Sequence, residues 1–168
     1  MPVREIVLYP HPVLKQRCEP LDPCTEQGRE LAQDLTDTLE SAPGVGVAAP
    51  QIGAPYRVII VDANRSKRHT GQGRFLLFNP EIVSATGRQV LREGCLSIPD
   101  YTGNVTRAET VVVVGLDPDG TEVRIESTGY EAVVFQHEID HLDGILFLDR
   151  ITNVKTDLFR RKPAKEHK

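Results

Sequence analysis

AVVFQHEIDHLDG, residues 132–144, is the stretch of sequence that decides the fold. Its apolar start, AVVF, predicts a helix that is buried in the core, and Gly144 suits the left-handed position that ends a helix. His137 and His141 are four positions apart, so one face of this helix presents both imidazoles. A buried pair of histidines beside a carboxylate requires a metal ion or a dedicated hydrogen-bond network. The stretch therefore predicts a core helix that carries a metal site.

Glu138 follows the first histidine directly, which places its carboxylate beside a bound ion. From there a carboxylate can take a proton from a metal-activated water and later deliver it to a leaving amine. A random chain of this composition contains an HExxH pattern in about one case in a hundred, so chance is a poor explanation. We therefore interpret Glu138 as the catalytic acid/base of a metal-dependent hydrolase.

Two imidazoles leave a catalytic site one protein ligand short, because such sites use three protein ligands and one open position. In one large protease class the third ligand is a downstream histidine, but Phe147 occupies that position here. Upstream, Cys95 lies in EGCLS, where a glycine lets the backbone approach a ligand. A Cys-His-His set suits iron(II), zinc, nickel or cobalt and leaves the centre open to oxidation. The alternative is that Cys95 is a small buried hydrophobe.

A third segment, GVGVAAPQIG over residues 44–53, is a candidate wall for a substrate. Its small side chains allow an extended peptide to pair with backbone donors and acceptors. Gln51 has a side-chain amide suited to a developing oxyanion. Taken alone, the segment is more typical of a tight turn.

The remaining chain consists of one amphipathic helix followed mainly by strands. Leu31, Leu35 and Leu39 recur every four residues within residues 25–41, as in an amphipathic helix. Segments rich in β-branched or aromatic residues and bounded by turns predict antiparallel strands over residues 56–62, 75–78, 107–116 and 122–126.

The tract DPDG, residues 117–120, is a hairpin signal between the last two strands, and a further turn is expected at Asn79-Pro80. The histidine-bearing helix is expected over residues 129–141, and a final helical piece over residues 153–161. This order predicts an α+β fold, in which antiparallel β-sheets pack around the C-terminal-half helix carrying the HExxH motif, with an N-terminal amphipathic helix.

Composition predicts a single catalytic domain over residues 1–168. The net charge of −4 gives no global electrostatic reason to bind nucleic acid. We expect a cytoplasmic protein that does not enter a membrane, because neither a secretory signal nor a long apolar run is present. Cys18 and Cys24 match no common zinc spacing and receive no role.

GVGVAAPQIG, EGCLS and QHEIDH, in this order and spacing, closely resemble the three motifs of peptide deformylases, and the likeness spans most of the chain. The resemblance implies removal of the formyl group from the formyl-methionine of nascent peptides, with release of formate. It implies one divalent ion, usually Fe2+, with Zn2+, Ni2+ or Co2+ as other occupants. Cys95, His137 and His141 are then its ligands, and Glu138 is the acid/base.

The same resemblance assigns Gln51 and the backbone N–H of Leu96 to the oxyanion. It also places further residues around the substrate: Val45, Gly46, Glu93, Gly94, Arg107, Tyr130, Val133 and Val134. Tyr130 stands where family members often have an aliphatic residue, which narrows the pocket. The stretch DYTGN, residues 100–104, lacks an arginine that some members place there, which leaves Arg107 as a contact for the substrate chain.

A basic tail spans residues 155–168, and similarity to bacterial members suggests that it docks on the ribosome. A solvated helix end explains the same charges equally well. We expect a monomer. Two alternative functions stay open: a relative that cleaves another short N-acyl group or a peptide, and a structural metal centre in a binding protein. Structural sites usually close all four coordination positions, which argues against the second.

Overall fold

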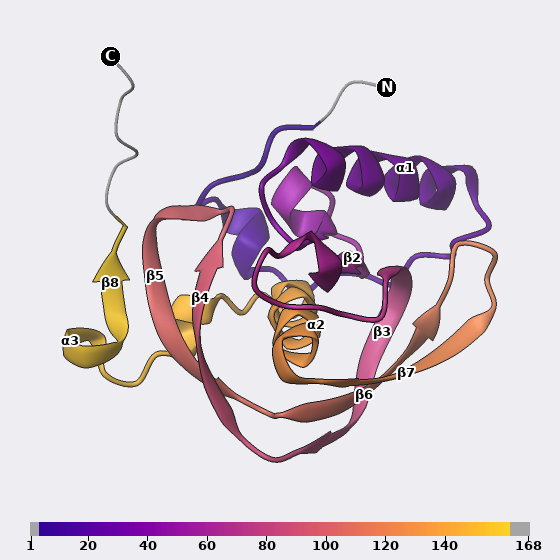
Figure 1. Ribbon diagram of the computed structural model, residues 1–168. Helices are drawn as coiled ribbons and strands as arrows, with labels where there is room; N and C mark the ends of the chain where they lie inside the picture. Colours follow the sequence, from indigo (N-terminus) through magenta and orange to yellow (C-terminus); the bar gives the residue numbers. More distant parts are fainter. Residues whose placement is uncertain (1–3, 162–168) are drawn as a thin grey trace.

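The computed structural model describes residues 4–161 and contains a long helix at the centre of two antiparallel sheets (Figure 1). The helices are α1 (Glu26–Ser41), α2 (Gly129–Leu142) and the short α3 (Val154–Asp157). The strands are β1 (Gly46–Ala48), β2 (Val58–Asp62), β3 (Arg74–Thr86), β4 (Gln89–Cys95), β5 (Ile98–Arg107), β6 (Thr110–Leu116), β7 (Glu122–Thr128) and β8 (Leu158–Arg160). Four 3-10 turns complete the described chain: Pro12–Lys15, Ala49–Ile52, Ala63–Arg65 and Phe147–Arg150.

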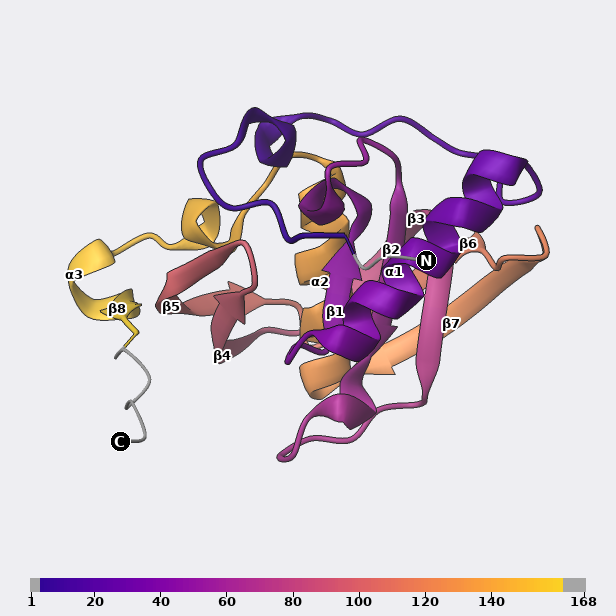
Figure 2. The same ribbon diagram turned by 90° about the horizontal axis from the view of Figure 1, so that it is seen from above.

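The two sheets lie on opposite sides of α2. The five-stranded sheet has the order β1-β2-β3-β6-β7, and the three-stranded sheet has the order β4-β5-β8. Viewed from above, α2 separates the two sheets, and β8 lies at the outer edge of the smaller one (Figure 2). The predicted α+β class, with antiparallel sheets around a central helix, is confirmed.

Helix α1 begins and packs as its sequence predicts. The Thr25 side chain accepts a hydrogen bond from the Gly28 N–H and caps the helix. Leu31, Leu35 and Leu39 are buried in one core cluster on the five-stranded sheet. The amphipathic pattern therefore identified the helix and its buried face.

Helix α2 is buried on nearly every side, in agreement with the apolar AVVF start. Its residues Ala132, Phe135 and Ile139 join a second core cluster, which lies on the opposite face of the same sheet. Strand β2 serves both clusters, because alternate side chains of a strand point to opposite faces. Beyond the helix, Gly144 has a φ of 74°, and a Cβ there would lie 2.6 Å from the Lys15 carbonyl. Only glycine fits that position.

The hairpin between β6 and β7 is confirmed, with Gly120 in the left-handed region (φ 83°). Three other expectations are wrong. Asn79-Pro80 forms no chain reversal, because β3 continues through it with an irregular register. Strands β4 and most of β5 were not expected. The final helical piece stops at Asp157, because β8 pairs with β5 in the register Thr102↔Phe159.

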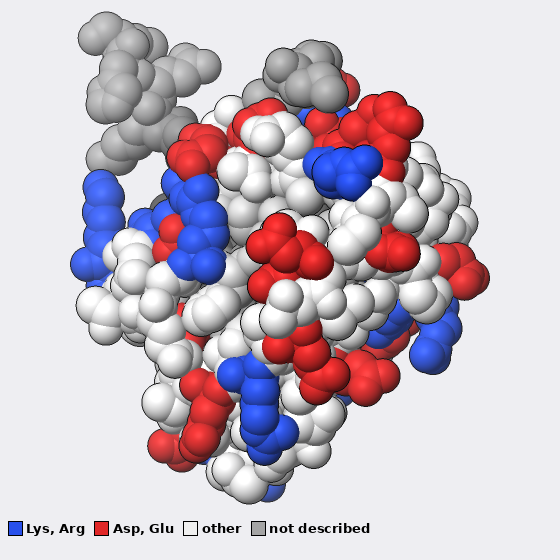
Figure 3. Space-filling view, turned by 90° about the vertical axis from the view of Figure 1, so that its right-hand side faces the viewer, with Lys and Arg blue, Asp and Glu red and all other residues white. Residues whose placement is uncertain are grey.

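On the face drawn in Figure 3, acidic and basic side chains are mixed. Within residues 4–161, no helix is long and apolar enough to cross a membrane.

Leu39→Ala tests the packing of α1. The side chain is fully buried (0 % exposed), so we expect the free energy of unfolding to fall by about 2–5 kcal/mol. Urea denaturation measures the change. The exposed Glu30 on the same helix provides the control, Glu30→Ala, which should change stability by less than about 0.5 kcal/mol. Equal effects would contradict the buried orientation.

We propose that the chain unfolds as one domain, which requires a single cooperative unfolding transition in urea.

Candidate active site

Three side chains with metal-binding atoms meet between the two sheets. Cys95 lies at the end of β4, and His137 and His141 lie one turn apart on α2. All three are buried, and their ligand atoms lie within 4.8 Å of one another. The Cys95 Sγ is 3.4 Å from the His141 Nε2. The separate sequence signals therefore converge on one site.

An irregularity in the β4-β5 register turns Cys95 toward α2. Gly94 still pairs with Thr102, whereas Cys95 pairs with Ile98, so the register shifts between these neighbours. A bulge of this kind bends its strand and redirects a side chain. The EGCLS segment thus contributes its thiol because the strand breaks its regular pairing there.

The two histidines differ in their electrostatics. Burial would lower the pKa of His137, but its contacts with Cys95 and Glu93 outweigh burial and raise the pKa well above its ordinary value. Burial lowers the pKa of His141 well below its ordinary value, which favours the neutral imidazole that binds metal. The His137 Nδ1 is 2.9 Å from the Glu93 Oε1. A carboxylate on one ring nitrogen orients the ring and leaves the other nitrogen for an ion.

Glu138 is poised to exchange a proton. Its carboxylate is buried, and burial raises its pKa to about 7. Among the described residues its Oε1 has no hydrogen-bond partner, a costly state that a water or substrate proton would relieve. Gly46 makes room for this side chain, because a Cβ there would lie 2.7 Å from the Glu138 Oε2. These features fit a site that binds a metal ion and a water molecule.

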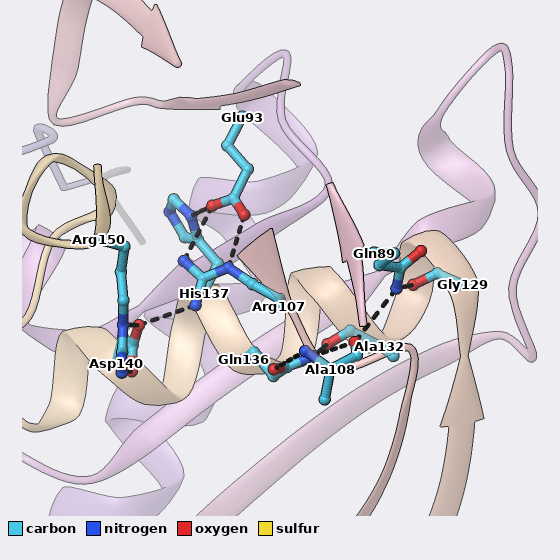
Figure 4. Close-up of polar contacts among 10 residues, drawn as sticks. All are labelled: Gln89, Glu93, Arg107, Ala108, Gly129, Ala132, Gln136, His137, Asp140 and Arg150. Carbon is cyan, nitrogen blue, oxygen red and sulfur yellow. Dashed lines mark hydrogen bonds and ion pairs between the residues drawn. The ribbon is translucent and has the colours of Figure 1, made fainter. Parts of the chain in front are cut away.

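Glu93 also joins a chain of ion pairs beside His137 (Figure 4), and this chain is buried except at Arg150, whose side chain is 46 % exposed. Arg107 binds both Glu93 oxygens, at 2.6 and 3.0 Å, and donates to Asp140 at 2.9 Å. Arg150 then binds both oxygens of Asp140, at 3.0 and 2.8 Å. Burial alone would raise the pKa of Glu93, but hydrogen bonds from His137 and Arg107 outweigh it and keep the pKa below its ordinary value.

The place of Arg107 bears on the role expected from sequence. Its side chain is 3 % exposed and lies behind Glu93, outside the lining of the cavity at the metal ligands. Both ion pairs occupy its guanidinium. Arg107 is therefore placed to fix Glu93 and Asp140, and its role as a contact for the substrate chain stays a prediction.

Gln51 is fixed beside the thiol. Its Oε1 accepts a hydrogen bond from the Ala48 N–H at 2.9 Å, which determines the orientation of the amide. Its Nε2 lies 3.2 Å from the Ser97 Oγ and 3.5 Å from the Cys95 Sγ. A fixed N–H donor thus faces the site, as an oxyanion requires.

A cavity of about 500 Å³ opens in front of these groups. Most of the predicted site residues line it: Val45, Gly46, Gln51, Glu93, Gly94, Cys95, Leu96, Tyr130, Val133, Val134, His137 and Glu138. His141 lies behind this lining, in contact with Cys95. The cavity also includes Gly44 of the predicted substrate wall, and four residues for which the sequence indicated no place in the site: Pro43, Arg92, Pro99 and Arg161.

Sequence reasoning also missed residues that support the site without lining the cavity. Ser97 and Asp140 stand inside the EGCLS and QHEIDH motifs, so their positions were visible, although their partners were not. Arg150 had no local signal, because its partner lies on α2. The other cysteines stand apart: Cys18 is in the core, where burial raises the pKa of its thiol to about 11, and Cys24 is exposed.

Known proteins resemble this chain over nearly its whole length. The family model described as "Polypeptide deformylase" matches residues 3–157. A peptide deformylase of Thermodesulfovibrio yellowstonii is 44% identical over 96% of this chain and 97% of its own. A peptide deformylase of Thermomicrobium roseum is 48% identical over 93% of this chain and 90% of its own.

Solved structures agree with the fold. A class I type b peptide deformylase of Acinetobacter baumannii, with Met-Ala-Ser bound, has a TM-score of 0.84 and 35% identity, covering 89% of this chain and 99% of its own. A peptide deformylase of Thermotoga maritima has a TM-score of 0.83 and 34% identity, covering 91% and 100%. The Cys-His-His cluster, the buried glutamate and these likenesses lead to one conclusion: the chain belongs to the polypeptide deformylase family.

Proposed function

We propose that this protein is a metallohydrolase that removes the formyl group from the N-terminal formyl-methionine of nascent peptides and releases formate. One observation carries the proposal: the ligand atoms of Cys95, His137 and His141 lie within 4.8 Å at the base of a cavity that Glu138 also lines. Membership of the deformylase family supports the choice of reaction.

The three ligands suit one divalent ion, which we propose to be Fe2+, with Zn2+, Ni2+ or Co2+ as replacements. When bound, the ion polarises the formyl carbonyl and lowers the pKa of a water molecule. Three protein ligands leave a coordination position open, as catalysis requires and a structural centre does not. The buried neutral state of His141 and the Glu93 contact to His137 favour binding of the ion.

Glu138 moves the proton in this proposal. As a carboxylate it takes a proton from the attacking water, and as an acid it delivers that proton to the departing amine. A pKa of about 7 lets both forms exist near neutral pH. The unpartnered Oε1 is the oxygen available for this exchange.

Gln51 and the backbone N–H of Leu96 bind the oxyanion that develops on the formyl oxygen. The Gln51 amide is already held in place by Ala48 and Ser97, so little reorganisation is needed during the reaction. Leu96 follows the ligand Cys95 directly and lines the same cavity.

The substrate peptide lies between β1 and β4. The backbones of Val45, Gly46 and Gly94 form the two walls, and Tyr130, Val133 and Val134 on α2 surround the methionine side chain. The Acinetobacter baumannii relative solved with Met-Ala-Ser bound supports a site for a peptide that begins with methionine. The Tyr130 ring stacks on His69, with 4.0 Å between centroids, which fixes that side of the pocket.

The proposal also covers the cellular location, the oligomeric state and the partner of the protein. We propose that the protein acts in the cytoplasm, as a monomer, on peptides that leave the ribosome. The basic tail over residues 155–168 is the proposed ribosome contact. Its residues 162–168 lie outside the described residues, and in the described part Arg160 and Arg161 are exposed.

Glu138→Gln should abolish catalysis and spare metal binding. Removal of a general acid/base costs about 10²–10⁴-fold in rate, and the amide cannot exchange a proton. The rate of formate release from formyl-Met-Ala-Ser and metal content per chain measure the two effects. The exposed Glu122 supplies the control, Glu122→Gln, which should keep both. An unchanged rate in Glu138→Gln would refute the assigned role.

Cys95→Ala should lose the metal. Loss of a hydrogen-bond partner of a metal ligand already lowers affinity by about 10- to 100-fold, so loss of a ligand should cost more. Metal analysis after desalting, with and without a competing chelator, measures the change. Cys24→Ala removes an exposed thiol and should retain the metal. Full metal content in Cys95→Ala would exclude the thiolate as a ligand.

The acyl group distinguishes a deformylase from a broader deacylase. Acetyl-Met-Ala-Ser differs from formyl-Met-Ala-Ser by one methyl group at the reacting carbon. A pocket that discriminates by one such group changes kcat/KM by roughly 10- to 200-fold. We expect the formyl peptide to be preferred by this amount in side-by-side assays. Equal turnover of the formyl and acetyl peptides would contradict a strict deformylase and would indicate a broader N-acyl hydrolase.

A further inference from the structure

Arg161 brings a guanidinium to the active-site cavity from the C-terminal strand. It lines the cavity together with Arg92, although the two lie 69 positions apart in sequence (161 − 92). Neither side chain has a part in the metal chemistry described above. Their position calls for a separate explanation.

The pairing of the three-stranded sheet puts both arginines on one face. Gly94 pairs with Thr102, and Thr102 pairs with Phe159 across β4-β5-β8. Paired residues point to the same face of a sheet, and so do residues two apart in one strand. Arg92 therefore shares the face of Gly94, and Arg161 shares the face of Phe159.

Arg92 fixes β8 in this position. Its guanidinium lies 3.6 Å from the centroid of the Phe159 ring, and its Nε donates to Asn104 Oδ1 at 3.1 Å. One residue past β8, the Arg161 N–H donates to the Asp100 carbonyl at 2.7 Å and continues the ladder. The contact with Phe159 and the backbone pairing together determine where the Arg161 side chain begins.

The Arg161 guanidinium ends directly above Gly94. A Cβ at Gly94 would lie 2.5 Å from the Arg161 Nη2, so this glycine makes room for the arginine. Gly94 is the neighbour of the metal ligand Cys95 and forms a wall of the proposed peptide path. A peptide that leaves the metal along β4 must pass the guanidinium.

The charge at this rim is free for a ligand. Among residues 4–161, no ion pair includes Arg92 or Arg161, whereas Arg107 and Arg150 are each paired. A guanidinium binds a planar carboxylate through two parallel hydrogen bonds.

We propose that Arg161, positioned by Arg92, binds a carboxylate of the substrate within the two residues that follow the formylated methionine. The carboxylate is an acidic side chain or, in a short peptide, the C-terminal carboxylate. The proposal rests on the proposed function and specifies its substrate. Arg161 is a specificity residue, because it contacts the substrate away from the reacting carbonyl.

The effect should appear in KM and not in kcat. An exposed ion pair contributes little to binding, whereas a bidentate guanidinium–carboxylate pair contributes more. We therefore expect a carboxylate on the substrate to lower KM by about 3- to 10-fold. Binding far from the reacting atoms stabilises substrate and transition state equally, which leaves kcat unchanged. Salt should reduce the difference, because exposed charges are screened.

Two substrate pairs identify the source of the carboxylate. Formyl-Met-Ala-Ser as the free acid is compared with its C-terminal amide, and formyl-Met-Asp-Ser amide with formyl-Met-Asn-Ser amide. A lower KM for the free acid assigns the C-terminal carboxylate, and a lower KM for the aspartate peptide assigns the side chain. Either result supports the proposal, and equal KM values in both pairs overturn it.

Variants assign the effect to Arg161. Arg161→Ala should abolish the KM difference, Arg161→Glu should reverse it, and Arg161→Lys should keep a part of it. Arg92→Ala should reduce the difference. The exposed Arg124 on β7 supplies the control, Arg124→Ala, which should preserve the difference. A difference that persists in Arg161→Ala would overturn the proposal.

The same assay separates this inference from the proposed function. Hydrolysis of the amide substrates at equal kcat by wild type and Arg161→Ala shows that the catalytic site is intact. If the wild type hydrolyses none of the formyl peptides, the proposed function fails. If it hydrolyses all of them with one KM, only the inference about Arg161 fails.

Discussion

The buried carboxylate of Glu93 is the contact on which the rest of the site depends. It binds Arg107 of β5 through both oxygens and His137 of α2 through one of them. Charge is balanced along this chain of contacts, with Glu93 and Asp140 against Arg107 and Arg150. Because a buried ion without a partner is strongly destabilising, Glu93, Arg107 and Asp140 require one another, and the exposed Arg150 adds a second partner for Asp140. The three-stranded sheet and α2 are thereby joined at the point where the thiol of one must meet the imidazoles of the other.

Two glycines show how closely the strands approach this centre. A side chain at Gly46 would collide with Glu138, and one at Gly94 would collide with Arg161. Both glycines lie in strands, where the residue type is otherwise unfavourable. Their presence is explained by what lies beside them: on one side the acid/base, and on the other the rim of the cavity. The walls of the peptide path are thus backbone, which suits a substrate recognised by its own backbone.

Sequence reasoning succeeded where a regular spacing of residues along the chain, a local period, determines the structure. Helices α1 and α2 have such a period, and the spacing of His137 and His141 placed both ligands on one face. It failed where contacts between residues far apart in sequence determine the structure. Residues 158–160 form a strand only because β5 offers an edge, and Arg107 is buried only because Glu93 and Asp140 neutralise it. The motif residues were therefore identified, whereas their supporting partners required the three-dimensional structure.

Chemistry and recognition occupy different parts of this molecule. The proposed metal ligands and Glu138 are buried and linked to the ion-pair chain, so any change there disturbs several charges together. Arg92 and Arg161, in contrast, are exposed and belong to no ion pair among the described residues. Substitutions at the rim are consequently far less costly to the fold than substitutions at the base of the cavity. If Arg161 selects peptides as proposed, the strand at the outer edge of the small sheet alters which peptides bind, while the reaction at the base of the cavity stays the same.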